Sequence, residues 1–383
     1  MIHLLLAVIY ISFISLGLPD SLLGSAWPLM YPQMGVDVSF AGIISVIISG
    51  GTVLSSLLSD RLTRKFGVGV VTAVSVSMTA LALLGFSAST RFWMLCLFAI
   101  PYGLGAGSVD AALNNYVALH YASKHMSWLH CMWGLGASIG PYILGFCLSA
   151  GKGWPAGYRT IGILQAVLAS ALIFYIPMWQ KMKSPEALNN TAPLSLLQIF
   201  QIPGAKAVIL AFFCYCGVEA TSFLWASSYM VLHRGISEET AVLYAGLFYL
   251  GITGGRALSG FLTMRYSDST LIRLGAAIII VGVFVLMIPA GPLAILLGFA
   301  LMGLGCAPIY PCIIHSTPAI FGAERSQALI GVQMAGAYVG STIIPPIFGL
   351  IANHVNIGLF PVYILVLSGT MILSYQILLR RTR

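Results

Sequence analysis

The sequence predicts an all-α membrane protein with twelve transmembrane helices, arranged as two six-helix halves related by a pseudo-twofold axis. Three observations support this prediction. Of 383 residues, 59% are hydrophobic and only 7% are charged, whereas soluble domains carry roughly 25% charged residues. Apolar runs of about 20 residues, the length that crosses a bilayer, recur along the whole chain. The second half also repeats sequence features of the first.

The predicted spans are separated by proline, glycine and clusters of charge. They cover residues 4–31, 38–58, 68–87, 92–120, 127–150, 158–180, 205–232, 239–262, 270–289, 293–316, 326–351 and 356–379. The more polar stretch KMKSPEALNNTAPLSLLQ follows the sixth span. We therefore expect an N-terminal bundle at 1–180, a cytoplasmic linker at 181–203 and a C-terminal bundle at 204–383.

An internal repeat relates the two halves. Span two, AGIISVIISGGTVLSSLLSDR, matches span eight, AGLFYLGITGGRALSGFLTMR, at an offset of 204 residues. GLGAGS in span four matches GLGCAP in span ten, and GASIG in span five matches GAYVG in span eleven, both at an offset of 200. Three matched pairs in order indicate a parallel repeat, an organisation found in secondary transporters whose substrate site lies near the midplane between the halves.

The distribution of positive charge predicts the topology. With the N-terminus in the cytoplasm, thirteen Lys and Arg residues fall in loops on one side and four on the other, with one inside a span. The positive-inside rule then puts both termini in the cytoplasm. The lack of soluble appendages favours a bacterial inner membrane. The net charge of +8 is thus a topology signal, and the expected partners are a small-molecule substrate and the lipid bilayer, with no nucleic acid, for a protein that works as a monomer.

No enzymatic or cofactor chemistry is indicated. The seven cysteines all lie in apolar segments and show no metal-ligand spacing. The sequence contains no nucleotide motif and no catalytic Ser/His/Asp constellation. We expect a protein that is not an enzyme, with no cofactor or metal and with the proton as coupling ion. Sodium is the alternative, since carboxylates with asparagine oxygens also bind it.

The loop after span two, which reads SSLLSDRLTRKFG, is similar to a signature sequence of a known protein family. It resembles the signature G-x-L-x-D-R-x-G-R-[RK] of the major facilitator superfamily. Asp60, Arg61 and Arg64 match the signature, whereas its two glycines are replaced by Ser56 and Thr63. The resemblance implies that this loop latches the two halves together on the cytoplasmic side.

Four segments are most similar to the fucose permease-like sugar:proton symporters: LPDSLLGSAWP, SVDAALNNYV, FCYCGVEAT and GRALSGFLTMR. The resemblance implies a role for Asp20 in sugar recognition, and for Asp110, followed four residues later by Asn114, in proton coupling. Some sugar-transporting relatives also carry a glutamate at the place of Glu219. Asn115 departs from the permease, which has proline there, and we include it among the substrate contacts.

Three of the ten acids, Asp20, Asp110 and Glu219, lie deep inside predicted spans. Each costs roughly 2.5–3.5 kcal/mol at the bilayer centre, so each must face a cavity, have a partner or be protonated. Desolvation favours the neutral form of a carboxylic acid, so such a group can load and release a proton, as a symporter requires. The alternative is a neutral acid hydrogen-bonded between helices.

Helical spacing suggests substrate contacts. Asp20 and Trp27 are seven residues apart and share a helix face, which would offer a sugar ring a carboxylate and an aromatic platform. Gln333 is the repeat counterpart of Trp133, so an amide would lie opposite an indole. For both tryptophans the alternative is packing or an interfacial belt. The candidate substrate-binding residues are Asp20, Trp27, Asn114, Asn115, Trp133, Tyr215, Glu219 and Gln333.

Two basic side chains complete the candidates. His130 in span five either assists proton transfer or has a structural role near the cytoplasmic mouth. Arg256 replaces Thr52 of the first repeat, and we expect it to meet a carboxylate or a helix C-terminus across the interface between the halves, unless it snorkels to the surface. The candidate proton-coupling residues are Asp20, Asp110, His130 and Glu219. The candidate latch residues are Asp60, Arg61, Arg64 and Arg256.

The leading functional hypothesis is proton symport of a small hydroxylated solute, a sugar first of all, through alternating access. A second hypothesis is a proton-driven efflux antiporter of amphipathic compounds. The segment GLGASIGP in span five resembles an antiporter signature, although its small residues also suit close helix packing. A third hypothesis is a lipid or glycolipid flippase, or a sensor that transports nothing.

Overall fold

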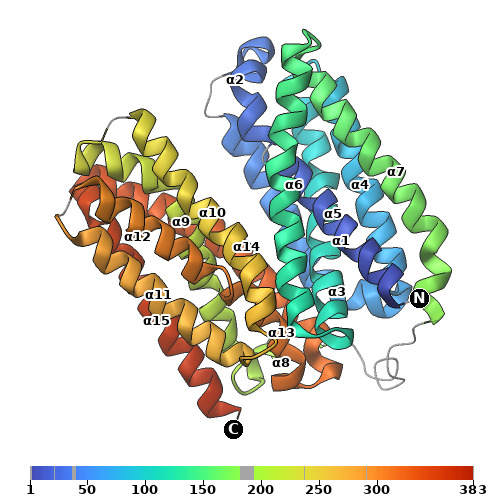
Figure 1. Ribbon diagram of the computed structural model, residues 1–383. Helices are drawn as coiled ribbons and strands as arrows, with labels where there is room; N and C mark the ends of the chain where they lie inside the picture. The colour runs from blue at the N-terminus through green and yellow to red at the C-terminus, as the bar shows by residue number, and fades with distance from the viewer. Residues whose placement is uncertain are drawn as a thin grey trace. The chain divides into compact units, whose positions relative to one another are not determined.

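The computed structural model describes residues 2–20, 22–36, 40–181, 194–236, 238–289 and 291–382, and these residues form helices joined by short connections (Figure 1). The chain divides into two compact units. The first contains the described residues of Met1–Tyr116 and Leu129–Pro193, and the second contains Val117–Trp128 and those of Leu194–Arg383. Residues 182–193 of the expected linker lie outside the described residues.

The helices of the first unit follow one another with short turns. They are α1 (Ile2–Asp20), α2 (Leu22–Met34), α3 (Ala41–Phe66), α4 (Val68–Ala88), α5 (Phe92–His120), α6 (Ser123–Ser149) and α7 (Gly153–Lys181). Glycines with positive φ end or begin several of them. Gly67, for example, with φ of 81°, separates α3 from α4, a conformation that costs glycine little because it has no Cβ.

The second unit begins with a short helix. Ser195 caps the N-terminus of this helix in a capping box. The elements of this unit are α8 (Leu196–Gln201), α9 (Ala205–Arg234), α10 (Glu238–Leu262), α11 (Asp268–Met287), α12 (Pro292–Cys306), α13 (Ile309–Phe321), α14 (Ala323–Ile351), the π-helix η3 (Ala352–Asn356), the 3-10 helix η4 (Ile357–Leu359) and α15 (Phe360–Arg381). The first turn of α13 follows Pro308, which lacks a backbone N–H to continue α12.

Each predicted span coincides with one helix or with two consecutive helices. Spans one and ten correspond to the pairs α1/α2 and α12/α13. Within the described residues, ten helical stretches are long and apolar enough to cross a membrane, the last of which, Ala323–Arg381, includes both α14 and α15. The expected eighth span is α10, which is not among the ten. The all-α membrane architecture is confirmed.

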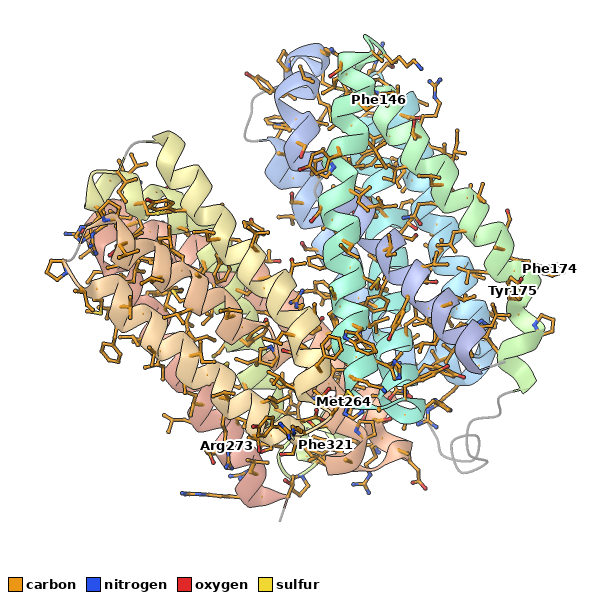
Figure 2. The ribbon with its side chains drawn as sticks, in the orientation of Figure 1. Phe146, Phe174, Tyr175, Met264, Arg273 and Phe321 are labelled. Atoms are coloured by element: carbon orange, nitrogen blue, oxygen red, sulfur yellow. The ribbon has the colours of Figure 1, made fainter. Side chains whose placement is uncertain are left out.

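Large apolar side chains on the outside of the helices indicate a lipid environment. In the first unit Phe146 is 74% exposed and Phe174 79% exposed, and both are labelled in Figure 2. Since lipid tails are as apolar as these side chains, their burial does not drive helix association in a bilayer, and close van der Waals packing at small residues does so instead.

Glycines provide this close packing at equivalent places in both units. A Cβ added at Gly103 of α5 would lie 2.2 Å from the carbonyl oxygen of Ile48 in α3. A Cβ added at Gly303 of α12 would lie 2.3 Å from the carbonyl oxygen of Phe248 in α10. Gly303 is 200 positions after Gly103, and Phe248 is 200 positions after Ile48. The equivalent packing therefore supports the internal repeat and gives both helix pairs the same offset of 200 residues.

This packing corrects the alignment of spans two and eight, which the sequence matches at an offset of 204. At an offset of 200 the counterpart of Arg256 is Ser56, a fully buried residue whose hydroxyl donates to the Gly107 carbonyl oxygen at 3.2 Å. The counterpart is therefore not Thr52. Four residues are close to one helical turn, so a glycine pattern on one helix face matches almost equally well at either offset.

Close packing also accounts for the GLGASIGP segment of α6. A Cβ at Gly136 would lie 2.0 Å from the carbonyl oxygen of Ile14, and one at Gly17 would lie 2.1 Å from the carbonyl oxygen of Trp133. Helices α1 and α6 therefore touch backbone to backbone. The small residues of this segment have a packing role, which is one of the two readings that the sequence left open.

We expect Gly136→Ala to destabilise the first unit by about 1–3 kcal/mol, the usual cost of forcing extra volume into a packed contact. Gly145→Ala on the same helix is the control, because an added Cβ there meets nothing within 4 Å. Thermal unfolding of the purified variants in detergent measures the difference. Equal melting temperatures for the two variants would contradict a tight α1–α6 contact.

Candidate functional site

Asp20, the last residue of α1, is exposed and is held by two aromatic donors of the first unit. Tyr102 of α5 donates its hydroxyl to Oδ1 at 3.1 Å, and Trp133 of α6 donates its indole N–H to Oδ2 at 2.8 Å. A carboxylate has about four lone-pair positions. Asp20 is thus oriented by its neighbours and retains acceptor capacity for the hydroxyl groups of a ligand.

Tyr102 is a site residue that the sequence did not single out. It is 7% exposed and packs edge-to-face against Phe86 of α4, with ring centroids 6.5 Å apart. The one feature of the sequence that could have indicated Tyr102 is its phenolic hydroxyl within an apolar span. A buried hydroxyl in a bilayer requires a partner, but nothing in the linear order of residues indicates that the partner lies 82 positions earlier.

Asp110 forms a buried polar chain with Asn114 and His130. The Asn114 side-chain amide donates to Oδ1 of Asp110 at 2.8 Å and to its backbone carbonyl at 2.9 Å. Nε2 of His130 lies 3.0 Å from Oδ1 of Asn114. Exposures of 9%, 0% and 5% for the three residues show that the chain is sealed from bulk solvent in this conformation.

The direction of these hydrogen bonds defines the protons they carry. An amide oxygen can only accept, so His130 must carry a hydrogen on Nε2. The Asn114 amide donates toward Asp110, which suits an ionised carboxylate. A protonated Asp110 keeps one acceptor oxygen, so the Asn114 amide can donate to it in either charge state. Asn114 thus connects Asp110 to His130 through hydrogen bonds to both.

Glu219 and Arg256 form a buried ion pair within the second unit. Nη2 of Arg256 lies 3.1 Å from Oε1 of Glu219, and the residues are 4% and 9% exposed respectively. The Arg256 guanidinium also lies over the Tyr310 ring, 6.0 Å from its centroid, in cation–π geometry. Their mutual attraction offsets part of the cost of burying the two charges.

This pair corrects the prediction for Arg256. Its acceptor is a carboxylate, as expected, but this carboxylate belongs to the same unit as Arg256 and not to the opposite half. The side chain is also too buried to snorkel to the surface. Arg256 therefore neutralises Glu219 and is not placed as a latch. The repeat could not show this, because the offset of 204 compared Arg256 with the wrong residue of the first half.

Two other candidates of the second unit are fully buried and already bonded. Tyr215 donates its hydroxyl to the Cys306 carbonyl at 3.0 Å. Gln333 and Thr317 bond each other through their side chains at 3.2 Å. Both Tyr215 and Gln333 have 0% exposure. In this conformation they are parts of the packed interior, and contact with a substrate would require their helices to move.

Trp27 is corrected from a substrate contact to a core residue. It is 4% exposed and lies in an apolar cluster with Leu22 and Met30. Its ring packs on Tyr31 and Phe92, with both centroid distances at 6.4 Å. Trp27 therefore has a packing role. The indole that accompanies Asp20 is Trp133, which comes from another helix.

The remaining candidates lie on α5 and at the end of α3. Asn115 is 5% exposed. Nε of Arg64 pairs with Oδ1 of Asp60 at 2.9 Å, one turn away on α3, and Arg61 is exposed. The other carboxylate oxygen of Asp60 is buried and has no hydrogen-bond partner among the described residues. A latch function for this loop remains a prediction.

Comparison with known proteins identifies the class. Residues 9–300 match the Major Facilitator Superfamily, and the chain belongs to this superfamily of membrane transporters. It is an integral, multi-pass membrane protein and a secondary transporter, not an enzyme. Its all-helical architecture is the fold of this superfamily.

Similar proteins differ widely in sequence. The chain is 23% identical over 407 residues to "Bypass of stop codon protein 6" of Saccharomyces cerevisiae, with 96% of this chain and 80% of that protein covered. It is 22% identical over 385 residues to the glucose/mannose transporter GlcP of Bacillus subtilis, with coverage of 98% and 94%. A crystal structure of the transporter FucP in the outward conformation superposes with a TM-score of 0.79 at 15% identity, covering 99% and 98%.

The ion pair of the second unit yields a stability prediction. Glu219→Gln and Arg256→Met should each lower the free energy of unfolding by about 3–5 kcal/mol, since each leaves one buried charge without its partner. The double variant should lose much less than the sum, because no charge remains. Unfolding in detergent by SDS titration measures all three variants. Strictly additive losses would show that Glu219 and Arg256 do not interact.

Proposed function

We propose that this transporter imports a small hydroxylated solute, with a sugar as the substrate class, by proton symport through alternating access. One observation carries the proposal. Within the first unit an exposed carboxylate, Asp20, oriented by Tyr102 and Trp133, accompanies a buried carboxylate, Asp110, bonded to an amide and a histidine. The exposed carboxylate suits recognition of a solute, and the buried carboxylate suits storage of a proton.

In this proposal Asp20 accepts hydrogen bonds from the hydroxyl groups of the solute, and Trp133 offers an indole beside them. Asp110 carries the coupled proton, and Asn114 and His130 position it. Glu219 is paired with Arg256, and in this proposal it contributes polarity without taking part in proton movement. Two relatives support the sugar as substrate class: GlcP is a glucose/mannose transporter, and the E. coli fucose:proton symporter FucP superposes on this chain with a TM-score of 0.76.

The proposal includes a topology and an energetic coupling. Both termini face the cytoplasm of a bacterial inner membrane, as the distribution of Lys and Arg predicts, and the chain works as a monomer. Coupling requires that solute and proton each favour the binding of the other, a reciprocal free energy of typically about 1–3 kcal/mol. Asp20 and Asp110 lie in the same unit, so motions of the helices that bear them can connect the two events.

Adding a transported monosaccharide to weakly buffered cells that express the protein should alkalinise the medium, because uptake by symport removes external protons. Asp110→Asn should abolish this pH change. It should leave the exchange of labelled sugar for unlabelled sugar intact, because exchange does not require net release of the proton. A pH electrode and a counterflow assay with a panel of monosaccharides measure the two activities.

The outcomes separate the competing functions. Absence of any pH change or counterflow with all sugars, in cells with verified surface expression, would overturn sugar symport. Solute-dependent acidification would identify an export antiporter. Uptake that requires sodium and leaves the pH unchanged would assign the coupling to sodium.

A separate prediction concerns Asp20. Tyr102→Phe and Trp133→Phe each remove one donor and keep the aromatic ring, so they should raise the KM for the sugar about tenfold through poorer orientation of the carboxylate. The solute-to-proton stoichiometry should not change. Tyr142→Phe is the control, since Tyr142 is 80% exposed on the same helix as Trp133. An unchanged KM in both site variants would exclude Asp20 from the solute site.

A further inference from the structure

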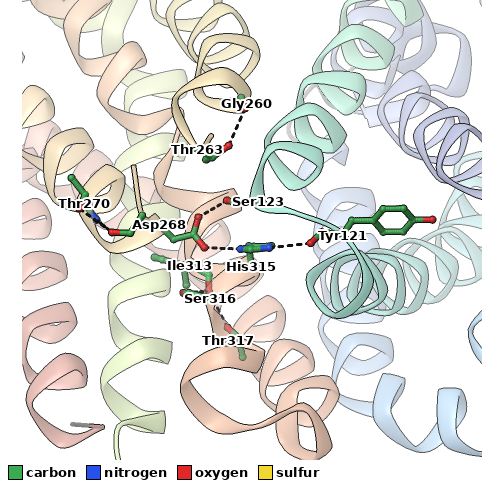
Figure 3. Close-up of polar contacts among 11 residues, drawn as sticks. Tyr121, Ser123, Gly260, Thr263, Asp268, Thr270, Ile313, His315, Ser316 and Thr317 are labelled. Carbon is green, nitrogen blue, oxygen red and sulfur yellow. Dashed lines mark hydrogen bonds and ion pairs between the residues drawn. The ribbon is translucent and has the colours of Figure 1, made fainter. Parts of the chain in front are cut away.

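The turn between α5 and α6 is held by helices of the second unit, although the remainder of α5 and α6 belongs to the first unit. A polar cluster formed by Ser123, Asp268, His315 and the Tyr121 carbonyl holds it. Figure 3 shows these groups as a continuous row of hydrogen bonds that runs from α11 through α13 to the turn. The proposed solute and proton sites do not involve this cluster.

The contacts of His315 define its protonation state. Its Nδ1 lies 2.6 Å from Oδ2 of Asp268, and its Nε2 lies 3.2 Å from the Tyr121 carbonyl oxygen. A backbone carbonyl and an ionised carboxylate can both only accept hydrogen bonds. With an ionised Asp268, both ring nitrogens therefore carry hydrogen and His315 is an imidazolium. The second oxygen of Asp268 bonds to the Ser123 hydroxyl, which fixes the carboxylate between the turn and the histidine.

A neutral imidazole cannot keep both hydrogen bonds. It has one N–H and one lone pair, so loss of the proton would set that lone pair against either the carboxylate or the carbonyl oxygen. The side chains of His315 and Asp268 are 20% and 14% exposed, so water replaces the lost bond poorly while a proton can still reach the site. The cluster is therefore complete at low pH and incomplete at high pH.

An aromatic anchor holds the other end of the same turn. The Trp128 indole donates to the Ala257 carbonyl oxygen at 3.4 Å and packs edge-to-face on Phe261, with ring centroids 5.5 Å apart. It sits on Gly260, where an added Cβ would lie 2.1 Å from the indole nitrogen. This anchor contains no group that titrates near neutral pH. The anchor itself therefore adds no pH dependence to the turn.

The remaining titratable groups near the cluster come from the surrounding elements. Cys312 on α13 and Tyr375 on α15 interact electrostatically with Asp268, and Arg273 on α11 interacts with Tyr375. Thiols, phenols and guanidinium groups keep their charge state between pH 6 and 8 unless their pKa is strongly lowered. His125 on the turn packs against the Tyr121 and Trp128 rings at 5.7 and 5.6 Å. It is the second histidine that an experiment must separate from His315.

We propose that Asp268 and His315 form a proton-dependent latch that holds the α5–α6 turn on the helices of the second unit and loosens it as the pH rises. Alternating access in this superfamily moves one half of the transporter against the other, and α5 and α6 cross from one unit to the other at this turn. Release of the turn would therefore favour conformations in which it has left α11 and α13. The latch makes this equilibrium sensitive to pH whichever solute is transported.

Hydrogen–deuterium exchange of the full-length protein in detergent tests the latch. The amides of peptides covering residues 121–128 are compared at pH 6 and pH 8.5, after correction for the intrinsic exchange rate at each pH. We expect their protection to fall about tenfold at the higher pH in the wild type, as loss of one charge-assisted hydrogen bond implies. In His315→Gln the protection should be low and independent of pH.

Asp268→Asn gives a sharper test, because it should restore the latch for a neutral histidine. Its amide group can donate to a bare Nδ1 while Nε2–H still donates to the Tyr121 carbonyl, so the loss of protection at pH 8.5 should disappear. His125→Gln is the matched control on the same turn and should behave like the wild type. Equal protection at both pH values in the wild type, or a pH effect that persists in His315→Gln or vanishes in His125→Gln, would overturn the proposal.

Discussion

Within a bilayer, lipid offers a polar side chain no hydrogen-bond partner, so burying one is costly unless the protein supplies the partner. This constraint explains most of the polar contacts described above. Asp110 is bonded by Asn114, Glu219 is neutralised by Arg256, and Gln333 is bonded by Thr317. The partner in each case is buried with the group it serves. The spans can therefore hold charged and amide groups and still remain apolar where they face lipid.

The three intramembrane acids differ because their partners differ. Glu219 is paired with an arginine, whereas Asp110 is bonded to an amide that in turn contacts a histidine. Among the described residues, Asp20 accepts hydrogen bonds from the Tyr102 hydroxyl and the Trp133 indole, and it is exposed, so it retains acceptor capacity for a further group. The same residue type thus occurs in three different environments, and the environment of a carboxylate decides which protonation state it favours.

Close backbone packing and the latch of the α5–α6 turn place opposite demands on the same helices. Gly17 and Gly136 let α1 and α6 touch without intervening side chains, which makes this pair a rigid part of the first unit. The turn that precedes α6 is held instead by a few polar bonds and one indole. A transporter needs both, since rigid bundles must move as bodies and the contacts that hold them in one conformation must be weak enough to break.

The sequence alone determined the helical class, the positions of the spans and the repeat, because hydrophobic length and glycine spacing are local properties that a bilayer converts directly into helices. It also identified Asp20, Asp110 and Glu219, since an acid in an apolar run is conspicuous. Only the tertiary structure decided the partners of these acids, the burial of Trp27, the correct counterpart of Arg256 and the contacts of His315. Those features depend on which helix faces meet, and residues such as Tyr102 and Asp20, 82 positions apart, become neighbours only when the helices pack.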